Sequence, residues 1–142
     1  MSSFEKRAIT AESALVALQG AAAKAKQLGH AMSLVVADEA GNVTASLRMD
    51  GASAATLRIA ADKAYTSASL QMATNALWDM IKNDPPLQHG LPAEPRIVAF
   101  GGGYPIKEDG ILIGAIGVSG GHYSDDMEVA RAGLAAIGSP VS

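Results

Sequence analysis

The stretch GGGYPIKEDGILIGAIGVSGG, from Gly101 to Gly121, determines the fold class of this 142-residue chain. It predicts a strand around YPI, a turn at KEDG, and a long apolar strand, ILIGAIGVS, that runs back over residues 111–119. Glycines inside the second strand indicate that another segment of backbone crosses it closely. This part of the chain is therefore expected to form an antiparallel hairpin packed tightly against a neighbouring element.

A second hairpin is predicted upstream of this stretch. AMSLVVAD, residues 31–38, reads as a buried strand, and EAGN forms the turn that follows it. In VTASLRMD, residues 43–50, apolar and polar side chains alternate, which places Arg48 and Asp50 on the wet face. RIVAF, residues 96–100, is expected to be a further strand. Two hairpins favour a mainly antiparallel sheet with helices available to cover its faces.

Helices are predicted between and after these hairpins. Thr10 caps a helix that ends at Gly29, and Ser53 caps an alanine-rich helix over residues 54–70 whose small residues should lie flat on the sheet. A third helix runs from about Thr74 to Lys82. Four prolines in NDPPLQHGLPAEP, residues 83–95, predict an irregular loop. The last helix is expected to start near Asp125, which caps it, and to end at Gly138.

Composition narrows the classes of function. The net charge is −3 with acids and bases interspersed, which argues against nucleic-acid binding, and cysteine is absent. No apolar run approaches the length of a membrane span, and the N-terminus lacks the apolar core of a secretory signal. We therefore expect one domain over residues 1–142, cytoplasmic, without nucleic-acid or membrane partners.

Two glycine-based motifs are poor guides to the chemistry. GVSGG, Gly117 to Gly121, matches the GxSxG pattern of hydrolases, but the only downstream histidine, His122, is too near to serve as the triad base. A phosphate cradle is disfavoured because Asp125 and Asp126 occupy the first turn of the next helix, where their charges would repel a phosphate. We interpret these glycines as the end of a strand.

Two clusters of polar residues are better candidates for a site. His122, with Tyr123 and Asp126 beside it, can act in proton transfer, ligate a metal or ligate haem iron, with Asp126 orienting its ring; the alternative is an exposed, idle histidine in a loop. Arg48 and Lys63 can bind a carboxylate; the alternative is a surface ion pair of Arg48 with Asp50 or Asp62. His30 and His89 are isolated in the sequence. No other metal site is predicted.

Several segments, in this order, resemble the haem-degrading or GlcG/HbpS-like family, formerly a domain of unknown function. They are RMDGA (48–52), AADKAYTSA (60–68), GGGYPI (101–106), GILIGAIGVSGG (110–121) and DDMEVARAGL (125–134). The resemblance implies an α/β (α+β) fold: a three-layer αβα sandwich of the profilin-like type with a five-stranded, mainly antiparallel sheet. It also implies a homo-oligomer in a family where some members bind haem. The family's usual loop after GVSG carries a proline, whereas this chain has GHYSDD.

These observations lead to one hypothesis and two rivals. The leading hypothesis is a small oligomeric protein that binds haem or another carboxylated ligand in one pocket, with haem as the cofactor that the resemblance implies. The first rival is a cofactor-independent isomerase, hydrolase or lyase acting on a small carboxylated intermediate, and the second is a structural or regulatory oligomer. The reactive residues assigned are His122, Tyr123 and Asp126, and the ligand-binding residues are Arg48, Asp50, Lys63, Gly101, Gly102, Gly103, Tyr104, Ser119 and Gly120.

Overall fold

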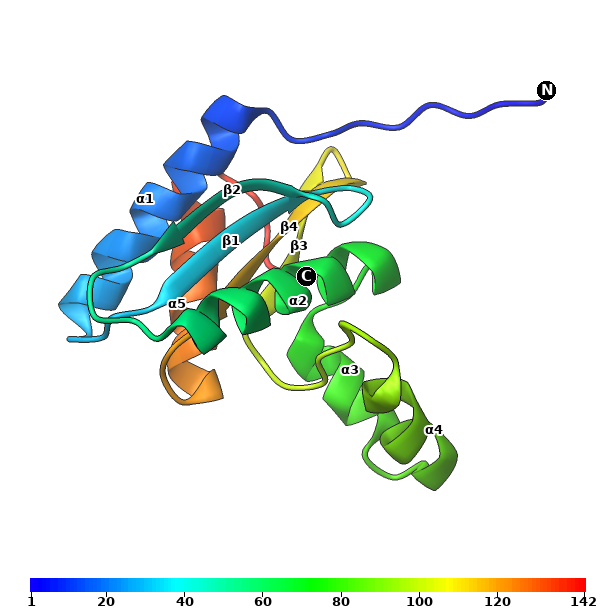
Figure 1. Ribbon diagram of the computed structural model, residues 1–142. Helices are drawn as coiled ribbons and strands as arrows, with labels where there is room; N and C mark the ends of the chain where they lie inside the picture. The colour runs from blue at the N-terminus through cyan, green and yellow to red at the C-terminus, as the bar shows by residue number, and fades with distance from the viewer.

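The sheet at the centre of the molecule has four antiparallel strands. The computed structural model describes all residues from Met1 to Ser142. Strands β1 (Ser33–Asp38), β2 (Val43–Arg48), β3 (Gly103–Glu108) and β4 (Ile111–Ser119) are ordered β2-β1-β4-β3, and every neighbouring pair is antiparallel. Both predicted hairpins are confirmed. The two hairpins meet where β1 pairs with β4, which joins them into one sheet (Figure 1).

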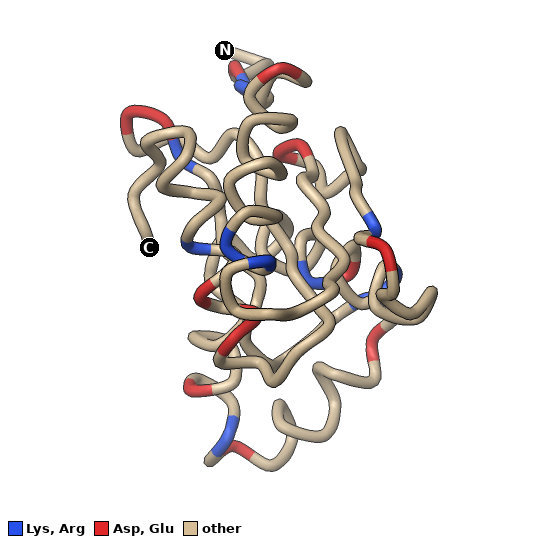
Figure 2. The backbone as a smooth tube through the Cα atoms, turned by 90° about the vertical axis from the view of Figure 1, so that its left-hand side faces the viewer, with Lys and Arg blue, Asp and Glu red and all other residues tan.

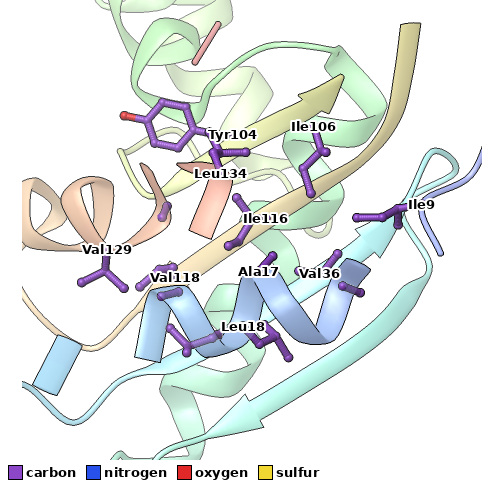
Figure 3. Packing of buried hydrophobic residues seen from close by; sticks show 14 of the residues in the cluster. Ile9, Ala17, Leu18, Val36, Tyr104, Ile106, Ile116, Val118, Val129 and Leu134 are labelled. Atoms are coloured by element: carbon purple, nitrogen blue, oxygen red, sulfur yellow. The ribbon is translucent and has the colours of Figure 1, made fainter. Parts of the chain in front are cut away.

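Helices cover both faces of this sheet, so the three-layer sandwich is confirmed. Helices α1 (Ala11–Gln27) and α5 (Tyr123–Ala136) pack together on one face, and α2 (Ala54–Leu70) lies on the other (Figure 1). On the α1/α5 face, Leu18 and Leu134 meet Ile116 of β4 in the larger core cluster (Figure 3). Thr10 caps α1 as predicted, because its hydroxyl accepts a hydrogen bond from the Ser13 N–H at 3.1 Å.

The alanine stripe of α2 sits unusually close to the sheet. Ala60, Ala64 and Ala68 are buried against Val35 and Ala115. A Cβ atom at Gly117 would overlap the carbonyl oxygen of Ala60, and one at Gly103 would lie 2.7 Å from the carbonyl oxygen of Lys63. Gly117 and Gly103 therefore lie where the backbone of α2 leaves no room for a side chain, and for Gly117 of β4 this close contact was predicted from the sequence.

The proline-rich segment is more regular than expected. After α3 (Thr74–Ile81), residues 83–95 include a short helix, α4 (Pro85–Gly90), and a 3₁₀ turn, η1 (Leu91–Ala93). The prediction of an irregular loop was therefore wrong over these nine residues. Prolines at the first positions of each helix explain this, since the N–H that proline lacks is unpaired there in any case. In Figure 1, α3 and α4 project away from the sheet.

Two further predictions about local structure were wrong. Residues 96–100 are not a strand, so the sheet has four strands rather than five. Instead, the Thr66 hydroxyl of α2 accepts a hydrogen bond from the Val98 N–H at 3.0 Å and lies 2.9 Å from the carbonyl oxygen of Arg96. In a strand, the Val98 N–H and the Arg96 carbonyl would pair with a neighbouring strand. Here the Thr66 side chain of α2 binds both of these backbone groups.

The second error concerns the start of the last helix. The helix begins at Tyr123 with His122 as its N-cap, and the His122 ring accepts the hydrogen bond from the Ser124 N–H. Asp125 was the expected cap, but its carboxylate oxygen Oδ2 lies 3.0 Å from the His30 Nε2 atom instead. The predicted end is confirmed, because Gly138 follows the helix with a φ of +67°.

Charged residues of both signs are spread along the whole chain (Figure 2). None of the helices combines the length and the apolar character needed to cross a membrane.

Candidate functional site

The candidate residues gather at one end of the sheet. Ser33, which begins β1, is paired with Arg48 at the end of β2 and with Ser119 at the end of β4, while Gly103 of β3 is opposite Gly117. The loops that extend beyond these positions therefore emerge together. The antiparallel register brings segments that are roughly 70 residues apart in the sequence to the same end of the sheet.

A buried ion pair between Lys63 and Asp126 lies at this end of the sheet. The Lys63 ammonium of α2 donates hydrogen bonds to the Asp126 carboxylate of α5 and to the carbonyl oxygen of Val118, each at 2.8 Å. Lys63 is fully buried and Asp126 is 2% exposed. The other carboxylate oxygen of Asp126 accepts the Gly121 N–H at 3.0 Å. The pair therefore connects both helical layers through the end of β4.

Burial shifts both groups towards their neutral forms. It lowers the pKa of Lys63 below its ordinary value, and the nearby Asp126 carboxylate offsets only part of that shift. It likewise raises the pKa of Asp126, against the opposing influence of the Lys63 ammonium and the hydrogen bond from Gly121. A pair held in this way can exchange a proton more readily than an exposed lysine and aspartate.

The glycine bend before β3 makes room for this pair. Gly102 has a φ of +127°, and a Cβ atom there would lie 2.7 Å from the Lys63 Nζ atom and 2.7 Å from the carbonyl oxygen of Val118. Phe100, just before the bend, places its ring centre 4.7 Å from the same Nζ atom. The ammonium thus contacts a carboxylate, a carbonyl and the face of an aromatic ring.

Phe100 also lines a cavity of about 700 Å³. Trp78 of α3 and Tyr123 of α5 form further aromatic walls, and we call this cavity the aromatic hollow. Its lining residues are Asn75, Trp78, Asp79, Ala99, Phe100, Gly101, Tyr123 and Met127. The buried side-chain oxygen of Asn75 makes no hydrogen bond within the chain. The hollow combines apolar walls with an unpaired acceptor, as ligand sites commonly do.

His122 stands beside this hollow rather than in contact with Asp126. Its Nδ1 atom is 2.8 Å from the Ser124 hydroxyl, and its ring centre is 4.0 Å from that of Tyr123. The Nε2 atom makes no hydrogen bond within the chain. Both oxygens of Asp126 bind elsewhere, so Asp126 does not orient the His122 ring as expected.

Arg48 and Asp50 line a second cavity of about 530 Å³, which we call the basic hollow because Lys26 and His30 also contribute to it. The Arg48 guanidinium donates a hydrogen bond to the carbonyl oxygen of Ala52 at 3.1 Å. It forms no ion pair with Asp50 or with Asp62, which binds Arg96 instead. Arg48 and Tyr123 therefore line different cavities, and this single chain does not assemble the one pocket that was predicted.

Of the remaining predicted residues, Tyr104 and Ser119 are buried, whereas Gly120 is exposed. Tyr104 is 3% exposed and its hydroxyl accepts a hydrogen bond from Arg131 at 3.0 Å, while Ser119 is 6% exposed. Gly120 has a φ of +142° and lies against Met32. None of these three lines either hollow.

Sequence reasoning missed most of the aromatic hollow. Trp78 fell within the predicted third helix without a role in the site, and Asn75, Phe100 and Met127 were not singled out. The available signal was the position of two aromatic residues, Trp78 and Phe100, on either side of the proline-rich segment.

Comparison with known proteins identifies the family. The model of the family described as "Haem degrading protein HbpS-like" matches residues 9–135. The chain belongs to the HbpS-like family. Among curated relatives of this HbpS-like chain, the corrinoid adenosyltransferase PduO of Salmonella typhimurium is 36% identical over 121 residues. That match covers 84% of this chain and 36% of PduO, so the chain spans about a third of PduO's length.

Solved structures of the family share the same fold. The structure described as a PduOC:heme complex superposes with a TM-score of 0.87 at 32% identity, covering 94% of this chain and 98% of that one. The structure of HbpS superposes with a TM-score of 0.85 at 30% identity, covering 94% of this chain and 93% of that one. The predicted family membership is thus confirmed.

Proposed function

We propose that this HbpS-like chain binds haem, with the tetrapyrrole ring in the aromatic hollow. The observation that carries the proposal is the hollow itself: about 700 Å³, walled by Trp78, Phe100 and Tyr123. A planar apolar ring is stabilised by contact with aromatic faces and by removal of its surface from water. Volumes of this order are typical of cofactor sites.

The residues present fit a haem group. Trp78 and Phe100 would contact the ring, and three side chains at the α5 end offer atoms that ligate iron in proteins: His122, Tyr123 and Met127. His122 is the favoured ligand because its Nδ1 atom is held by Ser124 while its Nε2 atom makes no hydrogen bond within the chain. When bound, haem would supply a redox-active iron that can bind small molecules.

The comparisons support this proposal from a second direction. A relative 32% identical to this chain, with the same fold over 94% of it, has been solved as a complex with heme. The family description itself refers to haem degradation. These statements concern the relatives, and they favour haem over the small catabolic acids of the first rival hypothesis.

The haem carboxylates require a separate account. Asp79 lines the aromatic hollow, and no lysine or arginine does. We therefore propose that the carboxylates point to solvent or to cations of a second copy of the chain in a homo-oligomer. Arg48 and Asp50, in the basic hollow, are proposed to contact the ligand only across such a subunit interface.

Absorbance titration with haem tests the proposal. We expect a shift of the Soret band with wild-type protein and a different band position for His122→Ala, because the residue that would ligate the iron is lost. Tyr123→Phe, which keeps the ring and removes the hydroxyl, is the matched control for ligation by the neighbouring residue. Absence of a Soret shift at micromolar haem in all three proteins would contradict the proposal.

A further inference from the structure

Lys63 contacts one of the aromatic residues that line the aromatic hollow. Lys63 is fully buried, and its Nζ atom lies 4.7 Å from the ring centre of Phe100, which also lines the hollow. Phe100 is itself 45% exposed. One partly exposed side chain therefore contacts both a buried primary amine and a cavity large enough for a ligand.

We propose that Lys63 is a nucleophilic amine that forms a Schiff base with aldehydes held in the aromatic hollow, with Phe100 as its movable cover and Asp126 as its proton carrier. The apolar and aromatic walls favour an aldehyde carried on an aromatic body. This activity does not depend on haem and goes beyond the proposed binding function, although it uses the same cavity.

Three features of the surroundings suit this chemistry. Asp126, 2.8 Å from the Nζ atom, is placed to accept the ammonium proton. Desolvation, which lowers the pKa of Lys63, increases the fraction of free amine, the form that attacks a carbonyl. Gly101 and Gly102 follow Phe100 directly, and glycine gives the backbone the freedom that movement of the ring requires.

The reaction balances with these groups alone. The Lys63 ammonium transfers a proton to the Asp126 carboxylate, and the free amine attacks the carbonyl carbon. The amine then loses its second proton to the carbonyl oxygen, which gives a neutral carbinolamine. The Asp126 carboxylic acid returns its proton to the carbinolamine hydroxyl, which leaves as water. The product is a protonated imine paired with the Asp126 carboxylate, and water reverses the sequence.

Reductive trapping on the full chain tests this inference. Native protein is incubated with benzaldehyde and sodium cyanoborohydride near neutral pH, and each modified lysine is quantified by peptide mass mapping. We expect Lys63 to be labelled several-fold faster than Lys82, an exposed lysine whose partner Asp79 lines the same hollow. The excess should disappear when the protein is unfolded in guanidinium chloride.

Variants test the role of the cover. Phe100→Leu should increase labelling at Lys63 several-fold and leave Lys82 unchanged. Tyr65→Leu is the matched control. Tyr65 lies on the same helix as Lys63, α2, but its ring contacts Arg96 rather than Lys63. Labelling of Lys63 no faster than of Lys82 in native wild-type and Phe100→Leu protein would overturn the inference. Haem titration is unaffected by that result, so failure of this inference and failure of haem binding are distinguishable.

Discussion

At the scale of single residues, the Lys63–Asp126 pair is the feature with the largest consequences. Both side chains are buried, and the pair is satisfied by only two further hydrogen-bonding groups, the Val118 carbonyl and the Gly121 N–H. Removing a charge from water costs several kcal/mol per ion, and the attraction of a close opposite charge offsets that cost. Loss of either member would therefore leave an unpaired charge buried in the protein and destabilise the fold.

Asp126→Asn should be strongly destabilising. It leaves the Lys63 ammonium buried without a counter-charge, so we expect a loss of about 3–5 kcal/mol in the free energy of unfolding, measured by urea denaturation. The double variant Lys63→Met/Asp126→Leu removes both charges and should recover most of that loss. If the double variant is no more stable than the single one, the cost does not arise from an unpaired charge.

Gly102→Ala should also destabilise the fold. Its φ of +127° is unfavourable for alanine, and the new methyl group would lie 2.7 Å from the Lys63 Nζ atom. We expect a loss of roughly 1–3 kcal/mol in the free energy of unfolding. Gly110→Ala is the control for backbone strain, since Gly110 also has a positive φ, +76°, but has no atom near the added methyl. Equal losses would show that contact with Lys63 is unimportant.

At the scale of elements, the segment before the glycine bend depends on a helix rather than on the sheet. Thr66 of α2 holds residues 96–98 through its hydroxyl, and Ala99 and Phe100 of the aromatic hollow follow at once. The position of one wall of the hollow is therefore set by a hydrogen bond made on α2.

Thr66→Val keeps the shape of the side chain and removes the hydroxyl. We expect a loss of about 1–2 kcal/mol in the free energy of unfolding, because the partly buried N–H of Val98 loses its acceptor. Hydrogen exchange at Val98 should become faster. Thr44→Val is the control, because Thr44 lies on the edge strand β2 and its hydroxyl makes no hydrogen bond within the chain. Unchanged exchange at Val98 would contradict the assigned role of Thr66.

At the scale of the whole molecule, periodic patterns were the reliable guide. The two hairpins, the alanine stripe of α2 and the αβα layers follow from residue spacing and from glycines that mark close backbone contact. RIVAF was assigned wrongly because its local pattern is that of a strand, whereas its hydrogen-bonding partner is a side chain 30 residues earlier. Local patterns carry no information about such distant partners.

The candidate site was predicted only in part for the same reason. Lys63 and Asp126 were both singled out, but their pairing joins residues 63 positions apart and leaves no trace in local spacing. The aromatic hollow combines three segments, each ordinary in isolation. The expected cytoplasmic location and the single domain over the full length of the chain stay predictions.

Association of chains belongs to this scale as well. Several large apolar side chains are exposed on the α3 and α4 side and on the edge strand, among them Trp78, Met80, Leu87 and Leu47. Burying such surface between subunits is favourable at about 25 cal/mol per Å². We expect sedimentation equilibrium to give a mass that is a multiple of the 14.4 kDa chain. A single species at the monomer mass would contradict the proposed homo-oligomer.

The central claim is that the aromatic hollow, rather than the basic one, receives the haem ring. The most direct test is a Soret titration of two variants that each fill one cavity, Ala99→Trp for the aromatic hollow and Ala31→Trp for the basic hollow. The account predicts that Ala99→Trp abolishes haem binding and that Ala31→Trp still binds haem, with at most a weaker affinity, because the basic hollow contacts only the haem carboxylates. Retained binding in Ala99→Trp together with lost binding in Ala31→Trp would contradict it.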